Sequence, residues 1–252
     1  MNSLEDRRIL VTGGTRGLGL GIVEALVKRK AEVAVVARDS KRLGELAQRL
    51  GITAISGDIV DRCLADSVLR EFQPNVLILN AGAIPSMKPI HEQSWEEFSV
   101  PWEQDVKACL YWIQAAIRLP LPPGSRVLIG SSGAAIGGSP LSGGYAGAKK
   151  MLWFMADYAN GVDASLSLGI RFQALVPTQI VGDTGVGDVA AVAYARRKGV
   201  STAEFLAAFG KPMPPHQYGE HVATLLVDPA FKSSTALGIK GETGISMLDG
   251  TR

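Results

Sequence analysis

Short runs of apolar residues alternate along the chain with longer stretches in which apolar residues recur every three or four positions. The short runs are rich in Val, Ile, Leu and Ala, which is typical of strands that are buried on both faces of a parallel sheet. They predict strands at 8–13, 32–38, 52–58, 75–82, 126–132, 170–177 and 244–250. The longer stretches predict helices at 17–30, 39–50, 61–72, 94–118, 143–160 and 216–227.

The order of these elements predicts an α/β fold, because strand and helix alternate from one end of the chain to the other. Such alternation is typical of a doubly wound, Rossmann-like parallel sheet, here of about seven strands with helices on both faces. We expect a single domain over residues 1–252. The one long interruption, 178–215, is predicted to contain short helices around 188–197 and 201–209, and its length indicates a lid or binding segment.

Composition narrows the class of protein. A chain of 252 residues that is 46% hydrophobic can bury a full core in one domain, and a net charge of +2 favours neither a nucleic-acid partner nor a membrane partner. Cys63 and Cys109 provide no disulfide framework, and the charged N-terminal residues do not resemble a signal peptide. We therefore expect a cytoplasmic protein. Because His91, His216 and His221 are scattered, we expect no metal site.

A glycine-rich loop, TGGTRGLG at 12–19, joins the first predicted strand to the first predicted helix. Glycines allow a sharp turn and a close approach of the backbone to a pyrophosphate, which would lie on the amides at the helix N-terminus. The alternative is a plain glycine turn, which the position between a strand and a helix disfavours. We expect the loop to bind a dinucleotide through Gly13, Thr15, Arg16, Gly17, Leu18 and Gly19.

The residues after the second strand indicate which cofactor binds. An acidic residue there would hold the ribose hydroxyls of NAD, but the chain has Ala37 followed by Arg38. Arg16 in the glycine loop adds a second cation, and the planar fork of arginine suits the 2′-phosphate of NADP. We expect NADP(H), with NAD(H) as the alternative because Asp39 is adjacent. Arg38 could also simply start a solvated helix capped by Asp39 or Ser40.

Polar residues follow the fifth strand at the edge where doubly wound folds bind ligands, and Ser132 is one of them. Tyr145 and Lys149 follow it at a spacing that places both on one face of a helix. Together with T-G-x-x-x-G-x-G at 12–19, NAG at 80–82 and the closing GISMLDG, this ordered set resembles the short-chain dehydrogenase/reductase family. The resemblance spans nearly the whole chain.

The resemblance implies an oxidoreductase that transfers a hydride between a nicotinamide cofactor and a carbonyl or alcohol. Tyr145 would be the acid/base, Lys149 would hold the nicotinamide ribose and favour the phenolate, and Ser132 would polarise the substrate oxygen. A surface pair of Tyr145 and Lys149 is the alternative, and Ser131 could replace Ser132. Further cofactor contacts implied by the resemblance are Asp58, Ile59, Asn80, Ala81, Gly82 and Ile180.

Two of these implied contacts have other readings. Asp58 could be a turn cap rather than an adenine contact. Asn80 would support the sheet and the wall of the cofactor site rather than take part in chemistry.

The chain departs from the family pattern at two positions. Asp105 stands where the family usually has an asparagine that helps to hold a water in the proton relay; near Lys149 a carboxylate would raise the lysine pKa. The alternatives are that the alignment of this helix is shifted, or that Asp105 is simply a solvated helix residue. Thr178 follows Pro177 where the family usually has glycine, and matching Thr184 to the family requires a small insertion.

The sequence does not name the substrate, but the segment after Pro177 is implied to cover it. This segment carries Val186, Val189, Tyr194, Phe205, Phe209 and Met213, which indicates a mainly apolar molecule. A catalytically weak or inactive nucleotide-binding regulatory protein is the alternative function, because fold does not determine function. The resemblance also implies a homotetramer or dimer, for which helices 94–118 and 143–160, with Trp102, Trp112 and Trp153, are candidate interfaces unless these tryptophans are core residues.

Overall fold

All seven predicted strands lie in one sheet, but the sheet has an eighth strand that the hydrophobic pattern missed. The structure is a computed structural model that describes residues 3–208 and 211–249; Phe209 and Gly250, named above, lie outside this part. The strands, in the order β3-β2-β1-β4-β5-β6-β7-β8, are bounded as follows: β1 Arg8–Thr12, β2 Glu32–Ala37, β3 Thr53–Ser56, β4 Val76–Leu79, β5 Arg126–Gly130, β6 Arg171–Pro177, β7 Ala236–Lys240 and β8 Gly244–Met247.

The prediction of about seven parallel strands was wrong at the C-terminal edge of the sheet. Strand β7, which was missed, pairs parallel with β6, and the predicted last strand is β8, which pairs antiparallel with β7. The run ALGIK is short, contains a glycine and ends in a charge, so its pattern alone resembles a turn. It becomes a strand because Leu237 and Ile239 are fully buried against one face of the sheet.

The predicted helices are present, with differences at two places. Helix 94–118 is divided into α4 (Trp95–Pro101), a π-helical turn η2 (Trp102–Val106) and α5 (Lys107–Arg118). Pro101 lacks an N–H, so the regular bonding pattern is interrupted there. Helix α7 (Gly144–Leu166) continues beyond the predicted end at 160, because one glycine, Gly161, costs too little to end a long packed helix.

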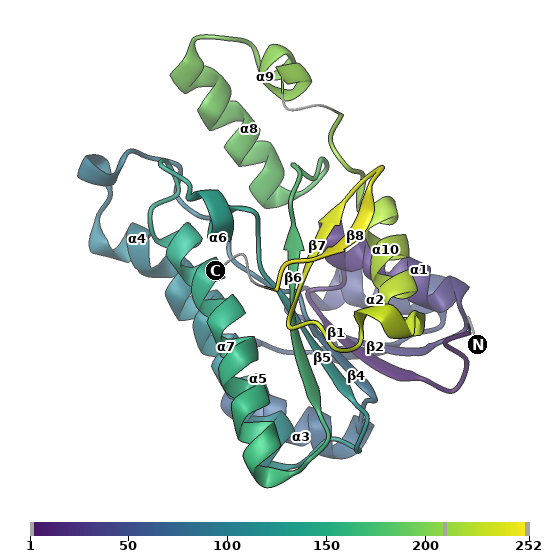
Figure 1. The fold of residues 1–252 in the computed structure, drawn as a ribbon. Coiled ribbons are helices and arrows are strands. Elements are labelled where there is room, and N and C mark those ends of the chain that lie inside the picture. Colours follow the sequence, from purple (N-terminus) through teal and green to yellow (C-terminus); the bar gives the residue numbers. More distant parts are fainter. Residues whose placement is uncertain (1–2, 209–210, 250–252) are drawn as a thin grey trace.

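The helices cover both faces of the sheet (Figure 1). Helices α1 (Gly17–Lys28), α2 (Ser40–Leu50) and α10 (Pro215–Val227) share one apolar core with the sheet, and α3 (Arg62–Phe72), α5 and α7 share the other. Short elements complete the described chain: η1 (Ile90–Glu92), α6 (Ala134–Gly137) and η3 (Pro229–Phe231). Within the described residues we find no helix with the length and apolarity needed to cross a membrane.

The segment after β6 forms a helical hairpin at the carboxyl end of that strand (Figure 1). It consists of α8 (Gly185–Lys198) and α9 (Thr202–Ala208), which confirms the two short helices predicted around 188–197 and 201–209. The hairpin has a small apolar cluster of its own, formed by Ala191, Ala195 and Phe205. It therefore stands above the edge of the sheet and away from its two main cores.

Candidate active site

A cleft of about 1260 Å³ lies at the carboxyl edge of the sheet, between the ends of the parallel strands and the α8–α9 hairpin. Most of the residues predicted to form the site line this cleft: Gly13, Thr15, Arg16, Gly17, Leu18, Arg38, Ile59, Asn80, Ala81, Gly82, Ser132, Tyr145, Lys149 and Ile180. Gly19, Asp58 and Asp105 lie outside the lining. The topology thus brings together most of the predicted set, because parallel strands end at one edge.

The glycine loop is shaped for an anion. Of the side chains that the structure describes, none caps the N-terminus of α1, so its first amides are available for a ligand. Gly19 contributes by close packing: a Cβ there would lie 2.1 Å from Gly13 O and 2.6 Å from Asn80 Nδ2. Glycine is required at this position because the loop folds directly against the NAG segment.

Thr12 is a site residue that sequence analysis missed. Its buried hydroxyl accepts hydrogen bonds from the backbone N–H groups of Asn80 (3.1 Å) and Ala81 (3.2 Å). The Asn80 side chain in turn donates to Gly13 O at 3.4 Å. Asn80 thus joins β4 to the glycine loop while lining the cleft, which agrees with the supporting role expected for it.

Three arginines line the end of the cleft beside β2: the predicted Arg16 and Arg38, and Arg42, which was missed. Asp39 caps α2, since its Oδ1 accepts a hydrogen bond from Arg42 N at 3.1 Å and its Oδ2 lies 3.3 Å from Arg42 Nε. Asp39, the residue that kept NAD(H) as an alternative, thus caps α2 and also lines the cleft. Arg42 could have been identified from its spacing of four residues from Arg38.

Asp58 has the geometry of a turn cap. Its Oδ1 accepts a hydrogen bond from Val60 N at 3.2 Å, and the neighbouring Ile59 lines the cleft in its place. The structure thus favours the turn-cap alternative for the Asp58 side chain.

Tyr145 and Lys149 are a buried pair near the start of α7. Their side chains are one helical turn apart, residues 145 and 149 are 8% and 6% exposed, and Lys149 Nζ lies 5.5 Å from the centre of the Tyr145 ring. The start of α7 approaches α4 so closely that a Cβ at Gly144 would lie 1.9 Å from Phe98 O. The alternative of a solvated surface pair was wrong.

The two serines after β5 have different environments. The Ser131 hydroxyl is buried and donates to Lys149 O at 2.8 Å, so its proton is used within the protein. Ser132 Oγ is half-buried and accepts a hydrogen bond from Ala134 N at 3.2 Å, an interaction that does not use its proton. Ser132 can therefore donate into the cleft, which favours it over Ser131 as a group that binds substrate.

Asp105 forms a buried ion pair with Lys149. Asp105 Oδ2 lies 3.1 Å from Lys149 Nζ, which also donates to Gly130 O at 3.1 Å, while Asp105 Oδ1 accepts from Ala83 N at 2.7 Å. Because Asp105 is 2% exposed, the alternative of a solvated helix residue was wrong. Burial by itself lowers the pKa of Lys149, but the charges of Asp105 and Tyr145 outweigh it, so the pKa of Lys149 is raised.

The substrate end of the cleft is lined partly by the predicted apolar residues. Val186, Tyr194 and Phe205 reach it, whereas Met213 is buried in the core beside β6 and Val189 lies outside the lining. Thr178 and Thr184, where the chain departs from the family pattern, both line the cleft, and Thr184 Oγ1 also caps α8 by accepting from Gly187 N at 3.0 Å.

Comparisons with known proteins show which family the chain is similar to. The family model described as short chain dehydrogenase matches residues 7–187. Hydroxynaphthalene reductase of Aspergillus fumigatus is 30% identical over 156 residues, which are 58% of this chain and 57% of that protein. Galactitol 2-dehydrogenase of Agrobacterium fabrum is 24% identical over 219 residues, 84% of each chain. Human L-xylulose reductase is 31% identical over 116 residues, 46% of this chain and 48% of that protein.

A solved structure shows the same fold. The 3-ketoacyl-(acyl-carrier-protein) reductase of Brucella melitensis, crystallised with NADH, superimposes with a TM-score of 0.77 at 22% identity. The match covers 95% of this chain and 99% of that chain. The match covers more of the chain than residues 7–187 of the family model, so the likeness of fold extends beyond them.

Proposed function

The chain belongs to the short-chain dehydrogenase/reductase family, and on this premise we propose that it transfers a hydride between NADP(H) and the carbonyl or alcohol group of a mainly apolar small molecule. The relatives are named as reductases and dehydrogenases, which supports an oxidoreductase acting on CH–OH and C=O groups. The observation that carries the proposal is the burial of Tyr145 and Lys149 beside Ser132, in the same cleft as the glycine loop.

The chemistry follows from these side chains. A bound nicotinamide supplies or accepts the hydride. In the direction of reduction, the Ser132 hydroxyl donates a hydrogen bond to the substrate oxygen, and the Tyr145 hydroxyl gives that oxygen its proton as negative charge develops on it. In the direction of oxidation, Tyr145 takes the proton back, and the Lys149 ammonium stabilises the resulting phenolate.

Asp105 holds this ammonium in place. Through its two oxygens it joins Lys149 to the backbone of Ala83 and hence to the segment after β4. A carboxylate here keeps Lys149 charged but also offsets part of the positive field at Tyr145. The expected asparagine would hold the same backbone contact without that offset.

Selectivity for NADP(H) rests on the arginines beside β2. Arg16, Arg38 and Arg42 line the cleft where the second strand ends, and the Asp39 carboxylate is occupied in capping α2. A 2′-phosphate carries negative charge that a guanidinium binds in bidentate fashion. NAD(H) offers no such group.

The substrate wall supports a mainly apolar ligand. Ile84, Met87, Val186 and Phe205 line the substrate end of the cleft, and Ile84 is 43% exposed at its mouth. Among the relatives, one is named for an aromatic substrate and others for polyols or sugars, so both classes belong in a substrate panel.

Self-association is part of the proposal. The exposed faces of α4, η2, α5 and α7 carry large apolar side chains: Trp95 is 72%, Trp102 38%, Leu110 42% and Val162 41% exposed. Trp112 and Trp153 are core residues, so they do not belong to the expected interface. A second copy of the chain would cover the remaining apolar face; sedimentation at micromolar concentration tests this, and a monomer would contradict it.

A panel of carbonyls and alcohols, followed by nicotinamide absorbance, tests the activity. The wild-type protein is expected to turn over at least one member, and Tyr145→Phe is expected to bind cofactor without turnover. A protein that binds cofactor but leaves the whole panel unchanged would support the regulatory alternative. Turnover by the Tyr145→Phe variant would refute the proposed mechanism.

A further inference from the structure

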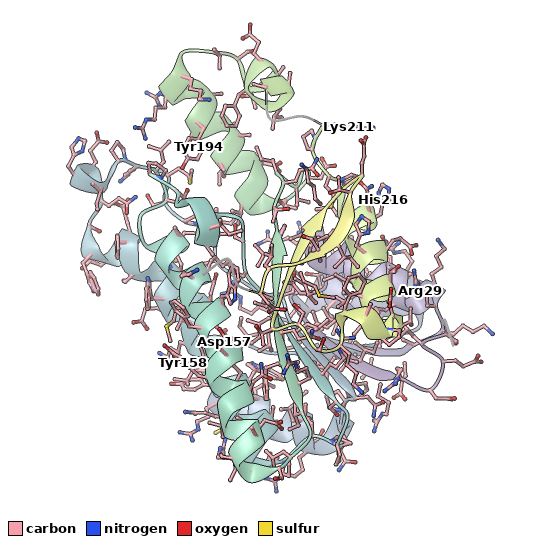
Figure 2. The ribbon with its side chains drawn as sticks, in the orientation of Figure 1. Arg29, Asp157, Tyr158, Tyr194, Lys211 and His216 are labelled. Atoms are coloured by element: carbon pink, nitrogen blue, oxygen red, sulfur yellow. The ribbon has the colours of Figure 1, made fainter. Side chains whose placement is uncertain are left out.

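The α8–α9 hairpin reaches across the cleft through the side chain of Tyr194. The Tyr194 ring stacks on Phe205 of α9, with ring centres 6.1 Å apart and planes inclined by 10°. Phe205 is buried inside the hairpin, so this stack holds the tyrosine in one orientation. Figure 2 shows Tyr194 on the side of α8 that faces α6.

The Tyr194 hydroxyl ends at the turn that precedes α7. It lies 2.8 Å from Ser139 Oγ, and the backbone N–H of Leu141 donates to it at 3.4 Å. Ser139 and Tyr194 both line the cleft. The hydroxyl therefore connects the wall that faces the substrate to the opposite rim of the same cleft.

The turn formed by residues 139–142 leads directly to Tyr145. Ser142 N donates to Ser139 O at 3.1 Å, and Tyr145 N donates to Ser142 O at 2.9 Å. On its other side the turn is held by Lys88 N, which donates to Leu141 O at 2.7 Å. A displacement of Ser139 or Leu141 would thus be passed along short backbone hydrogen bonds to the first turn of α7.

We propose that Tyr194 is a positioning residue of the reaction: its hydroxyl fastens the α8–α9 hairpin to the 139–142 turn, and this connection holds both the substrate wall and Tyr145 in their working positions. The inference rests on the proposed function of Tyr145. Tyr194 acts through Ser139 and Leu141, at a distance from the reacting atoms. The ring of Tyr194 belongs to the hairpin through its stack on Phe205, and its hydroxyl reaches the opposite rim.

Tyr194→Phe tests this connection because it removes the hydroxyl and keeps the stacked ring. We expect kcat/KM to fall about three- to tenfold, the effect of losing one intramolecular hydrogen bond, with a part of the loss in kcat. Ser139→Ala is expected to give a loss no larger than this, because the Leu141 N–H can still donate to the Tyr194 hydroxyl, and the double variant is expected to lose no more than Tyr194→Phe alone. The matched control is Tyr158→Phe on α7, where the side chain is 62% exposed and points away from the cleft (Figure 2).

Hydrogen exchange provides a readout that needs no substrate. In Tyr194→Phe the amides of Ser139, Leu141, Ser142 and α8 are expected to exchange faster than in the wild type, while those of the central strands do not change. In Tyr158→Phe none of these amides is expected to change. Wild-type exchange and wild-type kcat/KM in both single variants would overturn the inference, as would additive losses in the double variant. If Tyr145→Phe stays active, the proposed function fails, and the exchange result still decides whether the connection exists.

Discussion

Asp105 and Lys149 form a buried ion pair behind the hydroxyl-bearing Tyr145, with Oδ2 and Nζ 3.1 Å apart and side chains 1% and 7% exposed. The pair joins the π-helical turn η2 to α7, and π-helical turns in proteins are frequent at functional sites. Because Asp105 is a carboxylate, the charge of the site depends on both Asp105 and Lys149 rather than on Lys149 alone.

Asp105→Asn is expected to retain or exceed wild-type activity, because the amide oxygen can still accept from Ala83 N while the negative charge that opposes Lys149 is removed. The free energy of unfolding is expected to fall by about 1–3 kcal/mol, less than the usual loss for breaking a buried pair, because Lys149 keeps Gly130 O. Turnover assays and denaturant unfolding measure the two effects. Glu103→Gln, an exposed change in the same turn, is the control; a folded Asp105→Asn protein without activity would show that the carboxylate has a specific role.

The raised pKa of Lys149 predicts how stability depends on pH. A lysine whose pKa is higher in the folded than in the unfolded protein contributes stability that is fully present below about pH 10.4, the ordinary lysine value, and is lost as pH rises through the folded pKa. Wild-type stability is therefore expected to fall more steeply in this alkaline range than that of Asp105→Asn. Unfolding midpoints of both proteins, measured across this pH range, test the prediction. If stability falls with the same slope in both, the raised pKa of Lys149 is contradicted.

The two serines after β5 are expected to respond differently to alanine. Ser132→Ala removes the hydroxyl that can donate into the cleft, so kcat should fall by about 10²–10³-fold, as for loss of an oxyanion-stabilising donor. Ser131→Ala removes a hydrogen bond to Lys149 O, so its main effect should be a loss of about 1 kcal/mol of stability. Steady-state kinetics and unfolding of the two variants separate these roles, and an equal loss of kcat in both would refute the assignment.

Cofactor selectivity is expected to depend on Arg38. Arg38→Ala should weaken NADP(H) binding about 10–100-fold and leave NAD(H) binding almost unchanged, because only the former loses a charged hydrogen bond to a phosphate. Arg49→Ala is the matched control, since Arg49 lies on α2 and pairs with Glu24 at 2.9 Å, away from the cleft lining. Fluorescence titration with both cofactors measures the effect. A clear preference of the wild type for NAD(H) would refute the proposal of NADP(H) as the cofactor.

Two glycines of α7 are expected to respond in opposite directions to alanine. A Cβ at Gly144 would meet Phe98 O at 1.9 Å, so Gly144→Ala should displace the start of the helix, lower stability and reduce activity at Tyr145. At Gly161 a Cβ would meet no described atom within 4 Å, so Gly161→Ala should raise stability by up to about 1 kcal/mol with unchanged activity. Thermal unfolding of both variants checks the pair, and equal shifts would show that the close approach at Gly144 is not strained by a methyl group.

Local periodicity was enough to predict most elements, and most of the site residues that the motifs and the family resemblance implied line the cleft. Strand β7 was missed because its five residues include a glycine and show little hydrophobic periodicity. The burial of Leu237 and Ile239, by contrast, is a property of the folded sheet. The role of Asp39 was likewise undecided, since a carboxylate after β2 can face a ribose or cap a helix. The structure places Asp39 Oδ1 3.1 Å from Arg42 N, as the cap of α2, while residue 39 also lines the cleft.

The sequence by itself determined the alternation of strands and helices, the glycine loop and the order of Ser132, Tyr145 and Lys149, because each of these depends on separations along the chain. The tertiary structure decided that Asp105 is buried against Lys149, that Ser131 is used within the protein and that Tyr194 reaches Ser139, 55 residues away. Contacts of this kind join segments that are distant along the chain. Their energy comes from burial and from the exclusion of water, and both exist only once the chain has packed.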